Sequence, residues 1–185
     1  MARRAPRVSA RSDTAAPRAL LWAPWRSAYV GKTHAGGLSC IFCFGRIGVE
    51  VRRRRLVLHA GRLALVMLNR YPYSNGHLMV APRRHVASIE LLTREELIEL
   101  SELVARSVER LRAAYRPAGL NVGLNLGRAA GAGIADHMHW HLVPRWEGDN
   151  NFMPVIGSTR VLPQYLTETY EFLEPLFKSI ETTLS

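Results

Sequence analysis

The stretch that decides how this chain folds and works is HMHWHLV, residues 137–143, which places a histidine at every second position. Successive side chains of a β-strand point to opposite faces, so a strand here sends all three imidazoles to one side and Met138, Trp140 and Leu142 into a core. Imidazole is the side chain best suited to proton transfer near neutral pH. Three histidines in this register therefore predict one face of a functional site rather than ordinary packing.

The composition indicates one domain whose folded part is nearly neutral. The chain has 185 residues, 48% of them hydrophobic, and a net charge of +10. Residues 1–18 hold five arginines and one aspartate, and Arg52–Arg55 adds four more positive charges. We therefore expect a disordered basic tail over residues 1–18, a single domain over 19–185 and no nucleic-acid partner. The arginine run is predicted to form a solvated turn or an edge strand, and a phosphate-attracting patch is the alternative.

No segment of the sequence predicts insertion into a membrane or export. No apolar run approaches the roughly 20 residues that span a bilayer. The arginine-rich start lacks the apolar centre of a secretory signal, although its composition resembles that of a transit peptide. We therefore expect a cytoplasmic protein with no membrane partner.

Periodicity in the sequence predicts five strands and two helices. Apolar residues recur at helical spacing from Thr93 to about Tyr115, and Thr93 with Glu96 predicts a capping box at the start of this helix. Short runs rich in Val and Leu, or alternating in polarity, predict strands, of which the first two form a hairpin. This order of elements predicts an α+β fold with the helices on one side of the sheet. The expected strands are residues 56–59, 63–68, 77–81, 120–126 and 137–143, and the second helix is expected over 163–180.

The three histidines suit nucleophilic chemistry better than a shared metal ion. Along a strand the Cα atoms of His137 and His141 lie roughly 13 Å apart, whereas zinc ligands lie about 2 Å from their metal. We therefore expect His139 to act as a nucleophile while its neighbours fix its tautomer and protonate a leaving group. The preceding loop, GRAAGAG at residues 127–133, allows backbone N–H groups to approach an anion. Together these features indicate chemistry at phosphorus.

The chain has two cysteines, Cys40 and Cys43, in a C-x-x-C pair. A disulfide framework is not expected in a protein without a secretory signal. One such pair is a weak zinc signal, because a tetrahedral site needs four ligands and two histidines from elsewhere must complete it. A reduced cysteine pair with no metal is the alternative.

Several further motifs accompany the histidines along the chain. They are CIFC (40–43), NRYPY (69–73), GHLMV (76–80), PRRHV (82–86), NVGLNLG (121–127), HMHWHLV (137–143) and PRW (144–146). Together these motifs resemble the histidine triad (HIT) family of nucleotide hydrolases and transferases, and the resemblance covers about residues 20–170. Within the family, residues 69–73, 121–127 and 150–153 are most similar to the branch of diadenosine tetraphosphate (Ap4A) phosphorylases and dinucleoside polyphosphate hydrolases.

The resemblance implies a HIT-like fold, in which an antiparallel five-stranded sheet is combined with a long helix and a C-terminal helix, and it implies a homodimer. It also implies that His139 attacks the α-phosphorus of a nucleotide and carries a covalent intermediate, that His141 contacts the transferred phosphate, and that His137 supports both. Asn69 is implied to hold the ribose. The other implied phosphate contacts are Asn125, Gly131, Ala132 and Gly133, and a structural zinc, with no organic cofactor, is implied at Cys40, Cys43, His85 and His137.

One departure from the family pattern bears on the reaction. Family hydrolases of dinucleoside polyphosphates carry in this loop a glutamine that helps to place the attacking water. This chain has Ala132 there, followed by Gly133 where some phosphorylases use a hydroxyl. We therefore expect phosphate to be the second nucleophile, which makes the reaction phosphorolysis of Ap4A to ATP and ADP. The alternatives are a hydrolase of dinucleoside polyphosphates or nucleoside phosphoramidates, a non-catalytic nucleotide-binding adaptor, and a zinc hydrolase with His137 and His139 as ligands.

Overall fold

A computed structural model describes residues 40–45, 47–149, 164–178 and 180 of the chain. Residues 1–39, which include the expected basic tail over 1–18, the whole of 150–163 with the motif at 150–153, and residues 181–185 lie outside the described part. Among the described helices, none is both long enough and apolar enough to cross a membrane.

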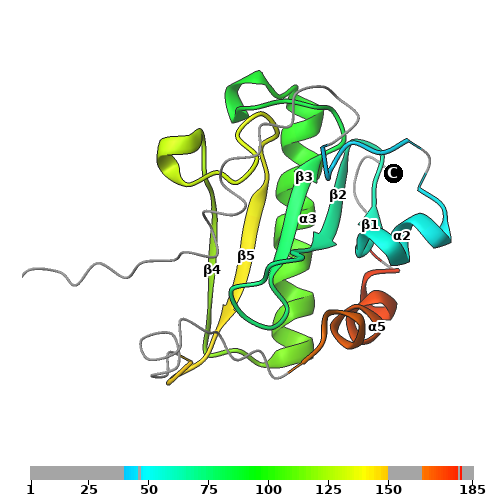
Figure 1. Cartoon of the computed structure of the whole chain (residues 1–185), viewed down its shortest axis with the longest axis vertical. Coiled ribbons are helices and arrows are strands. Elements are labelled where there is room, and N and C mark those ends of the chain that lie inside the picture. Colours follow the sequence, from blue (N-terminus) through cyan, green and yellow to red (C-terminus); the bar gives the residue numbers. More distant parts are fainter. Residues whose placement is uncertain (1–39, 46, 150–163, 179, 181–185) are drawn as a thin grey trace, which may run out of the picture.

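The centre of the fold is an antiparallel sheet of five strands in the order β1-β2-β3-β5-β4 (Figure 1). This confirms the α+β architecture expected from the sequence. The first two strands form the predicted hairpin, and β5 lies between β3 and β4, so the chain crosses from the middle of the sheet to its edge and returns. The strands are β1 (Val57–Ala60), β2 (Ala64–Leu68), β3 (Leu78–Pro82), β4 (Gly119–Leu124) and β5 (Trp140–Arg145).

The long helix predicted between Thr93 and Tyr115 is α3 (Arg94–Tyr115). It begins with the expected capping box, in which Glu96 N donates to Thr93 Oγ1 at 3.2 Å and Thr93 N donates to Glu96 Oε2 at 2.8 Å. The C-terminal helix is α5 (Leu166–Phe177), which starts three residues later than the expected 163 and ends three residues before the expected 180. Two short 3₁₀ turns, η1 (Ile89–Leu91) and η2 (Arg128–Ala130), complete the described elements together with α2 (Val49–Arg55).

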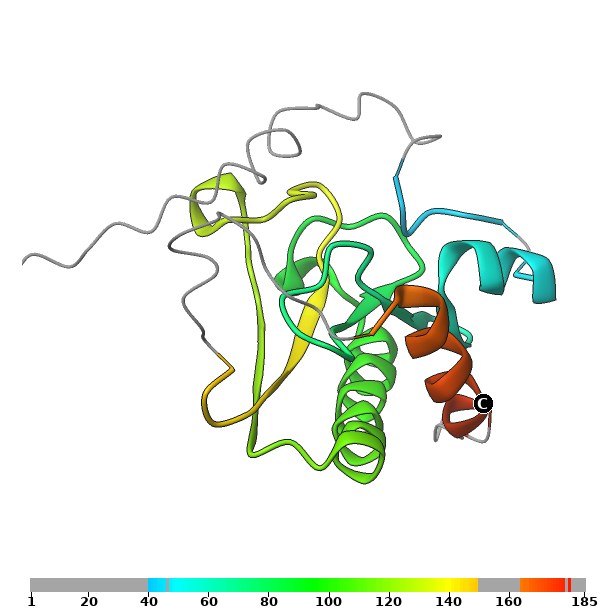
Figure 2. The ribbon, with the colours of Figure 1, turned by 60° about the horizontal axis from the view of Figure 1, so that its bottom comes forward.

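Both long helices contribute to one core on a single face of the sheet. Leucines of α3 pack against this face, and Leu173 and Phe177 of α5 join the same core beside β1, so α3 and α5 lie side by side (Figure 2). Because side chains alternate along a strand, the residues that face α3 are every second one, such as Val66, Val80 and Leu142. The neighbours of these residues point to the opposite face.

The opposite face is covered only in part by described residues. Residues 40–44 lie over β1, β2 and β3, where Phe42, which is 1% exposed, packs with Leu65, Met67 and Met79. The half of this face that is formed by β4 and β5 carries polar side chains and the pocket described below. The sheet therefore separates an apolar core from a face that is available for chemistry.

Two local expectations from the sequence are wrong. The run Arg52–Arg55 forms the end of α2 rather than a turn or an edge strand, because basic side chains complement the negative end of a helix dipole and Arg53 pairs with Glu171 of α5 at 2.8 Å. The histidine strand begins at Trp140 rather than His137. Residues 137–139, which precede Trp140, do not pair with β3, and the His137 side chain instead donates to Pro82 O at 2.9 Å.

Candidate functional site

The three histidines of the 137–143 stretch lie close together, but they do not share one strand face. Only His141 belongs to β5, where it pairs with Met79 of β3 and Gly123 of β4. The ring of His139 lies between those of Phe42 and His141, with centroid distances of 4.9 and 4.8 Å. His137 is fully buried and turns toward the cysteines. The expected row of three imidazoles is thus divided between two different environments.

His139 is held as a neutral imidazole with one defined tautomer. Its Nδ1 lies 2.9 Å from the carbonyl oxygen of His137, which can only accept a hydrogen bond, so Nδ1 carries the proton and Nε2 keeps a lone pair. Burial lowers the pKa of His139, which favours the uncharged ring at neutral pH. An uncharged imidazole with a free Nε2 lone pair can attack an electrophile.

A hydrogen bond from another buried histidine, His77, sets the tautomer of His141. The backbone N–H of Tyr73 donates to His77 Nδ1 at 3.1 Å, so the His77 proton is on Nε2 and is donated to His141 Nδ1 at 3.0 Å. This leaves His141 Nε2 as an N–H donor. The chain reaches His77 through Gly76, whose φ of 72° favours glycine and which closely approaches the Tyr115 ring. Sequence spacing gave no signal for this relay, because His77 is 64 residues from His141.

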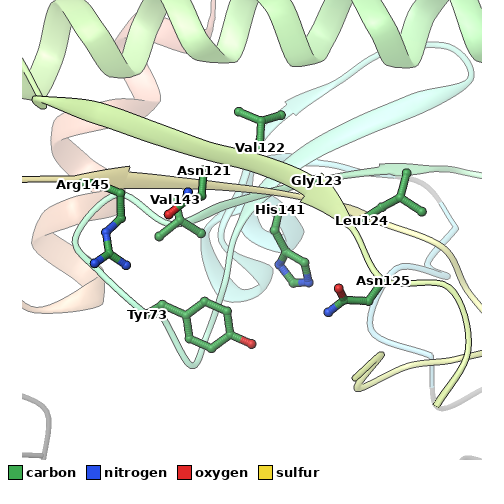
Figure 3. Close-up of a pocket in the computed structure, with 9 residues that line it drawn as sticks. All are labelled: Tyr73, Asn121, Val122, Gly123, Leu124, Asn125, His141, Val143 and Arg145. Atoms are coloured by element: carbon green, nitrogen blue, oxygen red, sulfur yellow. The ribbon is translucent and has the colours of Figure 1, made fainter. Parts of the chain in front are cut away.

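A pocket with a volume of about 310 Å³ opens beside His141, on the face of β4 and β5 that points away from α3. Figure 3 shows the side chains of Tyr73, His141 and Asn125 converging on this space, with Arg145 at the end opposite Asn125. Sequence reasoning predicted His141 and Asn125 as site residues but missed Tyr73, Asn121 and Arg145. The signal that could have found the last two is alternation along β4 and β5. The lining residues are Tyr73, Asn121, Val122, Gly123, Leu124, Asn125, His141, Val143 and Arg145.

Asn69, the expected ribose contact, lies beside His77 and not among the residues that line this pocket. Its Oδ1 accepts a hydrogen bond from Tyr71 N at 2.9 Å, and its Nδ2 is 3.4 Å from His77 Nδ1. Asn69 thus lies at the start of the β2–β3 loop, next to both ring nitrogens of His77, with its Nδ2 also 3.5 Å from the Nε2 that contacts His141.

The loop expected to cradle phosphate is closed by its own hydrogen bonds. Gly131 N donates to Arg128 O at 2.9 Å, and Ala132 N donates to Gly127 O at 3.2 Å. Asn125 Nδ2 donates to Gly131 O at 3.4 Å, which fastens the loop to the end of β4. The Ala132 side chain is only 4% exposed, whereas Gly133 is exposed. The structure places this loop near the pocket through Asn125, and the phosphate contacts of residues 131–133 stay a prediction.

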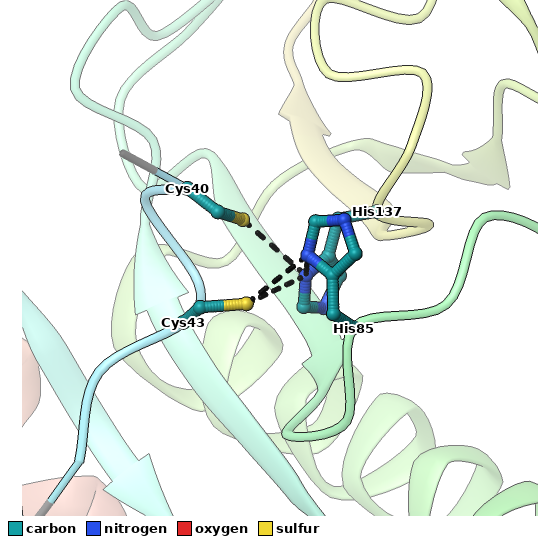
Figure 4. Close-up of side chains that lie close together, drawn as sticks. All are labelled: Cys40, Cys43, His85 and His137. Carbon is teal, nitrogen blue, oxygen red and sulfur yellow. Dashed lines mark hydrogen bonds between the residues drawn. The ribbon is translucent and has the colours of Figure 1, made fainter. Parts of the chain in front are cut away.

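The four residues implied as metal ligands do come together, from three segments of the chain. Cys40, Cys43, His85 and His137 each offer one ligand atom, and these four atoms all lie within 4.8 Å of one another (Figure 4). The Nδ1 of His137 lies 3.3 Å from Cys40 Sγ and 3.4 Å from Cys43 Sγ, and His85 Nδ1 lies 3.2 Å from Cys43 Sγ. This cluster joins residues 40–43 to β3 and to the start of β5.

The donor set fits a metal ion in its protonation as well as in its spacing. His137 Nε2 donates to Pro82 O at 2.9 Å, so its Nδ1 is unprotonated toward the thiols, and burial lowers its pKa to about 4. His85 turns its Nε2 toward the Asp136 carboxylate at 3.6 Å and its Nδ1 toward the same centre. Without a cation, burial and the adjacent Cys40 raise the pKa of Cys43 to about 11. A bound cation stabilises the thiolates that this arrangement otherwise disfavours.

Comparison with known proteins agrees with this geometry. The HIT domain family model matches residues 53–148. The AP-4-A phosphorylase of Mycobacterium tuberculosis strain H37Rv is 40% identical over 158 residues, which span 83% of this chain and 81% of that protein.

Solved structures agree with the fold. A hypothetical histidine triad nucleotide-binding protein from Sulfolobus tokodaii strain 7 superimposes with a TM-score of 0.56 and 27% identity, over 75% of this chain and 89% of that one. A zinc-bound histidine triad family protein from Mycobacterium smegmatis has the same fold, with a TM-score of 0.58 and 23% identity over 77% of this chain and 95% of that one. The chain belongs to the HIT domain family.

Proposed function

We propose that this protein is a nucleotidyl transferase that phosphorolyses Ap4A to ATP and ADP through a covalent nucleotidyl-histidine intermediate. The observation that carries the proposal is the tautomer of His139, whose Nδ1–H is fixed by the His137 carbonyl, so that Nε2 carries a lone pair in a ring that packs against His141. Membership of the HIT family and 40% identity to an AP-4-A phosphorylase support the same reaction.

In the first step, His139 Nε2 attacks the α-phosphorus of Ap4A. The bond between this phosphorus and the bridging oxygen breaks, ATP leaves, and AMP stays bound to the imidazole. His141 Nε2–H donates to an oxygen of the phosphoryl group, where negative charge develops. The His77–His141 hydrogen bond holds that donor in place before the substrate arrives, which lowers the cost of reorganisation.

In the second step, an oxygen of inorganic phosphate attacks the same phosphorus, the bond to His139 breaks, and ADP is released. Position 132 favours phosphate over water as the second nucleophile, since Ala132 has no side-chain amide and its methyl group is buried. No side chain at this position can therefore orient a water molecule. A two-step path of this kind predicts ping-pong kinetics.

The proposed nucleotide contacts are those expected from the resemblance. Asn69 contacts the ribose from the β2–β3 loop, and His139 with His141 holds the reacting phosphate. Asn125, which lines the pocket, is supported as a phosphate contact by its position next to His141 (Figure 3). Gly131, Ala132 and Gly133 complete the proposed set, and because the N–H groups of Gly131 and Ala132 bond to Arg128 O and Gly127 O, a phosphate that they contact must replace these bonds. No organic cofactor is needed for either step.

We propose that Cys40, Cys43, His85 and His137 hold a structural zinc ion. Two thiolates and two imidazole nitrogens are a ligand set typical of closed, tetrahedral zinc sites. Bound zinc supplies a cross-link between residues 40–43 and the start of β5, and no step of the reaction passes through it. His139 lies two residues after His137, so a fixed His137 also fixes the carbonyl that sets the His139 tautomer.

A homodimer is part of the same proposal. Strand β4 is at the edge of the sheet, and Val122 in its middle is 42% exposed, so this edge can pair with a second copy. Sedimentation of the purified protein tests the assembly, and a monomer at micromolar concentration contradicts it. The cytoplasmic location expected from the sequence stays a prediction.

Product analysis on Ap4A with and without inorganic phosphate tests the reaction. ATP plus ADP that forms only with phosphate supports phosphorolysis, whereas ATP plus AMP indicates a hydrolase. If neither a dinucleotide nor a nucleoside phosphoramidate is turned over, the enzyme proposal is wrong and a nucleotide-binding adaptor remains.

A further inference from the structure

We propose that the pocket along β4 and β5 receives the leaving half of the substrate, and that Arg145 at its far end is a specificity-determining residue that binds phosphate oxygens of that half. The inference rests on the proposed function, because it takes His139 and His141 as the place where the α-phosphate reacts. It adds a subsite and a residue to which the sequence analysis gave no role.

The pocket follows two paired strands, and this gives it a direction. His141, Val143 and Arg145 alternate along β5 and all line the pocket. On β4, Asn121 is paired with Val143 and Gly123 is paired with His141. The reacting end is therefore at His141, and the guanidinium of Arg145 lies at the other end (Figure 3).

The length of this groove fits a long leaving group. The Cα atoms of His141 and Arg145 are four strand residues apart, which corresponds to about 13 Å. An amine or a single phosphate that leaves from the phosphorus at His141 does not span this distance. ATP, the leaving group of Ap4A, carries three phosphates and a nucleoside and extends along the groove. Only a long anionic leaving group therefore reaches Arg145.

Gly123 keeps the groove open at its reacting end, beside His141. A Cβ atom built on Gly123 has no atom within 4 Å, so a side chain there would extend into free space on the pocket face. Gly123 is paired with His141 and lines the pocket, so any side chain at this position takes space that the leaving group would use. Its backbone is not in the left-handed region, which means that a β-branched residue fits the strand without strain.

The charge at the far end suits phosphate. Arg145 is the only lysine or arginine among the described residues that line the pocket, and no carboxylate lines it. One nitrogen of its guanidinium donates to Asp149 Oδ1 at 2.7 Å, which fixes the side chain while its other N–H groups keep their capacity to donate. A guanidinium binds phosphate oxygens through two parallel hydrogen bonds, which an ammonium or an amide does not reproduce.

Two substrates that share a nucleotidyl half but differ in leaving group distinguish binding of the leaving group by Arg145 from a general effect on catalysis. Ap4A and adenosine 5′-phosphoramidate both transfer AMP to His139, but the first releases ATP and the second releases ammonia. We expect Arg145→Gln to lower the ratio of kcat/KM for Ap4A to kcat/KM for the phosphoramidate by at least about tenfold, the size of one lost charge-assisted contact. Gly123→Val lowers the same ratio, because its side chain fills the groove.

Two matched variants serve as controls. Arg106→Gln removes the same charge from a surface pair on α3, where Arg106 contacts Glu109 at 3.3 Å, and leaves the ratio unchanged. Asp149→Asn removes the ion pair that holds the guanidinium but keeps its charge, and we expect it to lower the ratio by less than Arg145→Gln. If the two variants lower the ratio equally, the ion pair and not a phosphate contact carries the effect, and the inference is wrong.

Two further outcomes overturn the inference. The first is an unchanged ratio in Arg145→Gln, and the second is an equal loss for both substrates. Absence of turnover of both substrates by the wild-type protein contradicts the proposed function and the subsite together. That result is distinct from an active wild type whose ratio does not respond to Arg145, which contradicts the subsite alone.

Discussion

Two histidine pairs lie on either side of His139: His85 with His137 in the metal cluster, and His77 with His141 in the relay. His137 and His141 have the same tautomer, protonated at Nε2, but use it for opposite purposes. In the metal cluster, His137 is anchored through Nε2–H to Pro82 O and presents the Nδ1 lone pair to the thiols. In the relay, Nδ1 of His141 is anchored by His77 and the Nε2–H is the group that faces the pocket. The ring nitrogen that is anchored thus decides whether a histidine offers a lone pair or a proton.

His139 lies between these two pairs and is the exception. Its Nδ1–H is anchored on the His137 carbonyl, so the atom directed toward a ligand is an unprotonated Nε2. A phosphorus atom placed between His139 and His141 therefore meets a lone pair from one histidine and a proton donor from the other.

The largest effect is expected for His139→Ala, which removes the Nε2 lone pair that we propose attacks phosphorus. We expect Ap4A turnover to fall by about a thousandfold or more, since no covalent intermediate can form. Nucleotide binding, followed by calorimetry, stays measurable, and enzyme quenched in alkaline denaturant, which preserves a P–N bond, no longer retains labelled AMP. A variant that keeps turning over Ap4A at a rate near that of the wild type would falsify the nucleophile assignment.

Loss of the metal ligands is the next largest change. Cys43→Ser replaces a thiolate with a poor ligand, and we expect the variant to lose zinc and about 3 kcal/mol or more of unfolding free energy, because a metal present at a hundred times its Kd contributes about this much. Metal analysis and thermal unfolding with and without a chelator measure both effects. Asp136→Asn, which keeps all four ligands, is the control and should retain its zinc. Wild-type protein that contains well below one zinc per chain contradicts the proposal.

The sequence predicted the strands, the long helix and its cap because these depend on local periodicity and on side chains within one turn. The sequence also predicted that Cys40, Cys43, His85 and His137 form one metal site, but only through the family resemblance. What it missed depends on contacts across the fold: His77 meets His141 from another strand, and Arg145 faces the pocket only once β4 and β5 are paired. The expected start of this strand at His137 is wrong because the His137 side chain, and not a backbone N–H of the strand, bonds to Pro82 O.

The relay provides a smaller effect with a specific signature. His77→Ala leaves His141 Nδ1 without its donor, and we expect kcat/KM for Ap4A to fall by about 10- to 100-fold, as for other residues that orient a functional histidine. His77→Gln can return an N–H to the same place and should recover part of this loss. Steady-state kinetics on both variants measures the difference. If the two variants are equally impaired, His77 acts through packing and not through the hydrogen bond.

The smallest effect concerns His59 of β1, a histidine outside the site whose ring hydrogen-bonds to the backbone of Phe177. Burial lowers the pKa of His59, and the nearby charge of Arg52 lowers it as well. The hydrogen bond to the Phe177 backbone and the charge of Glu99 offset part of this decrease. The unfolded chain therefore binds more protons than the folded chain below about pH 6.5, so stability is lost as the pH falls through that value. His59→Gln should flatten this part of the curve of unfolding free energy against pH and leave Ap4A turnover unchanged. Urea unfolding between pH 5 and 8 measures the slope, and a variant whose slope equals that of the wild type shows that His59 is not the group that titrates.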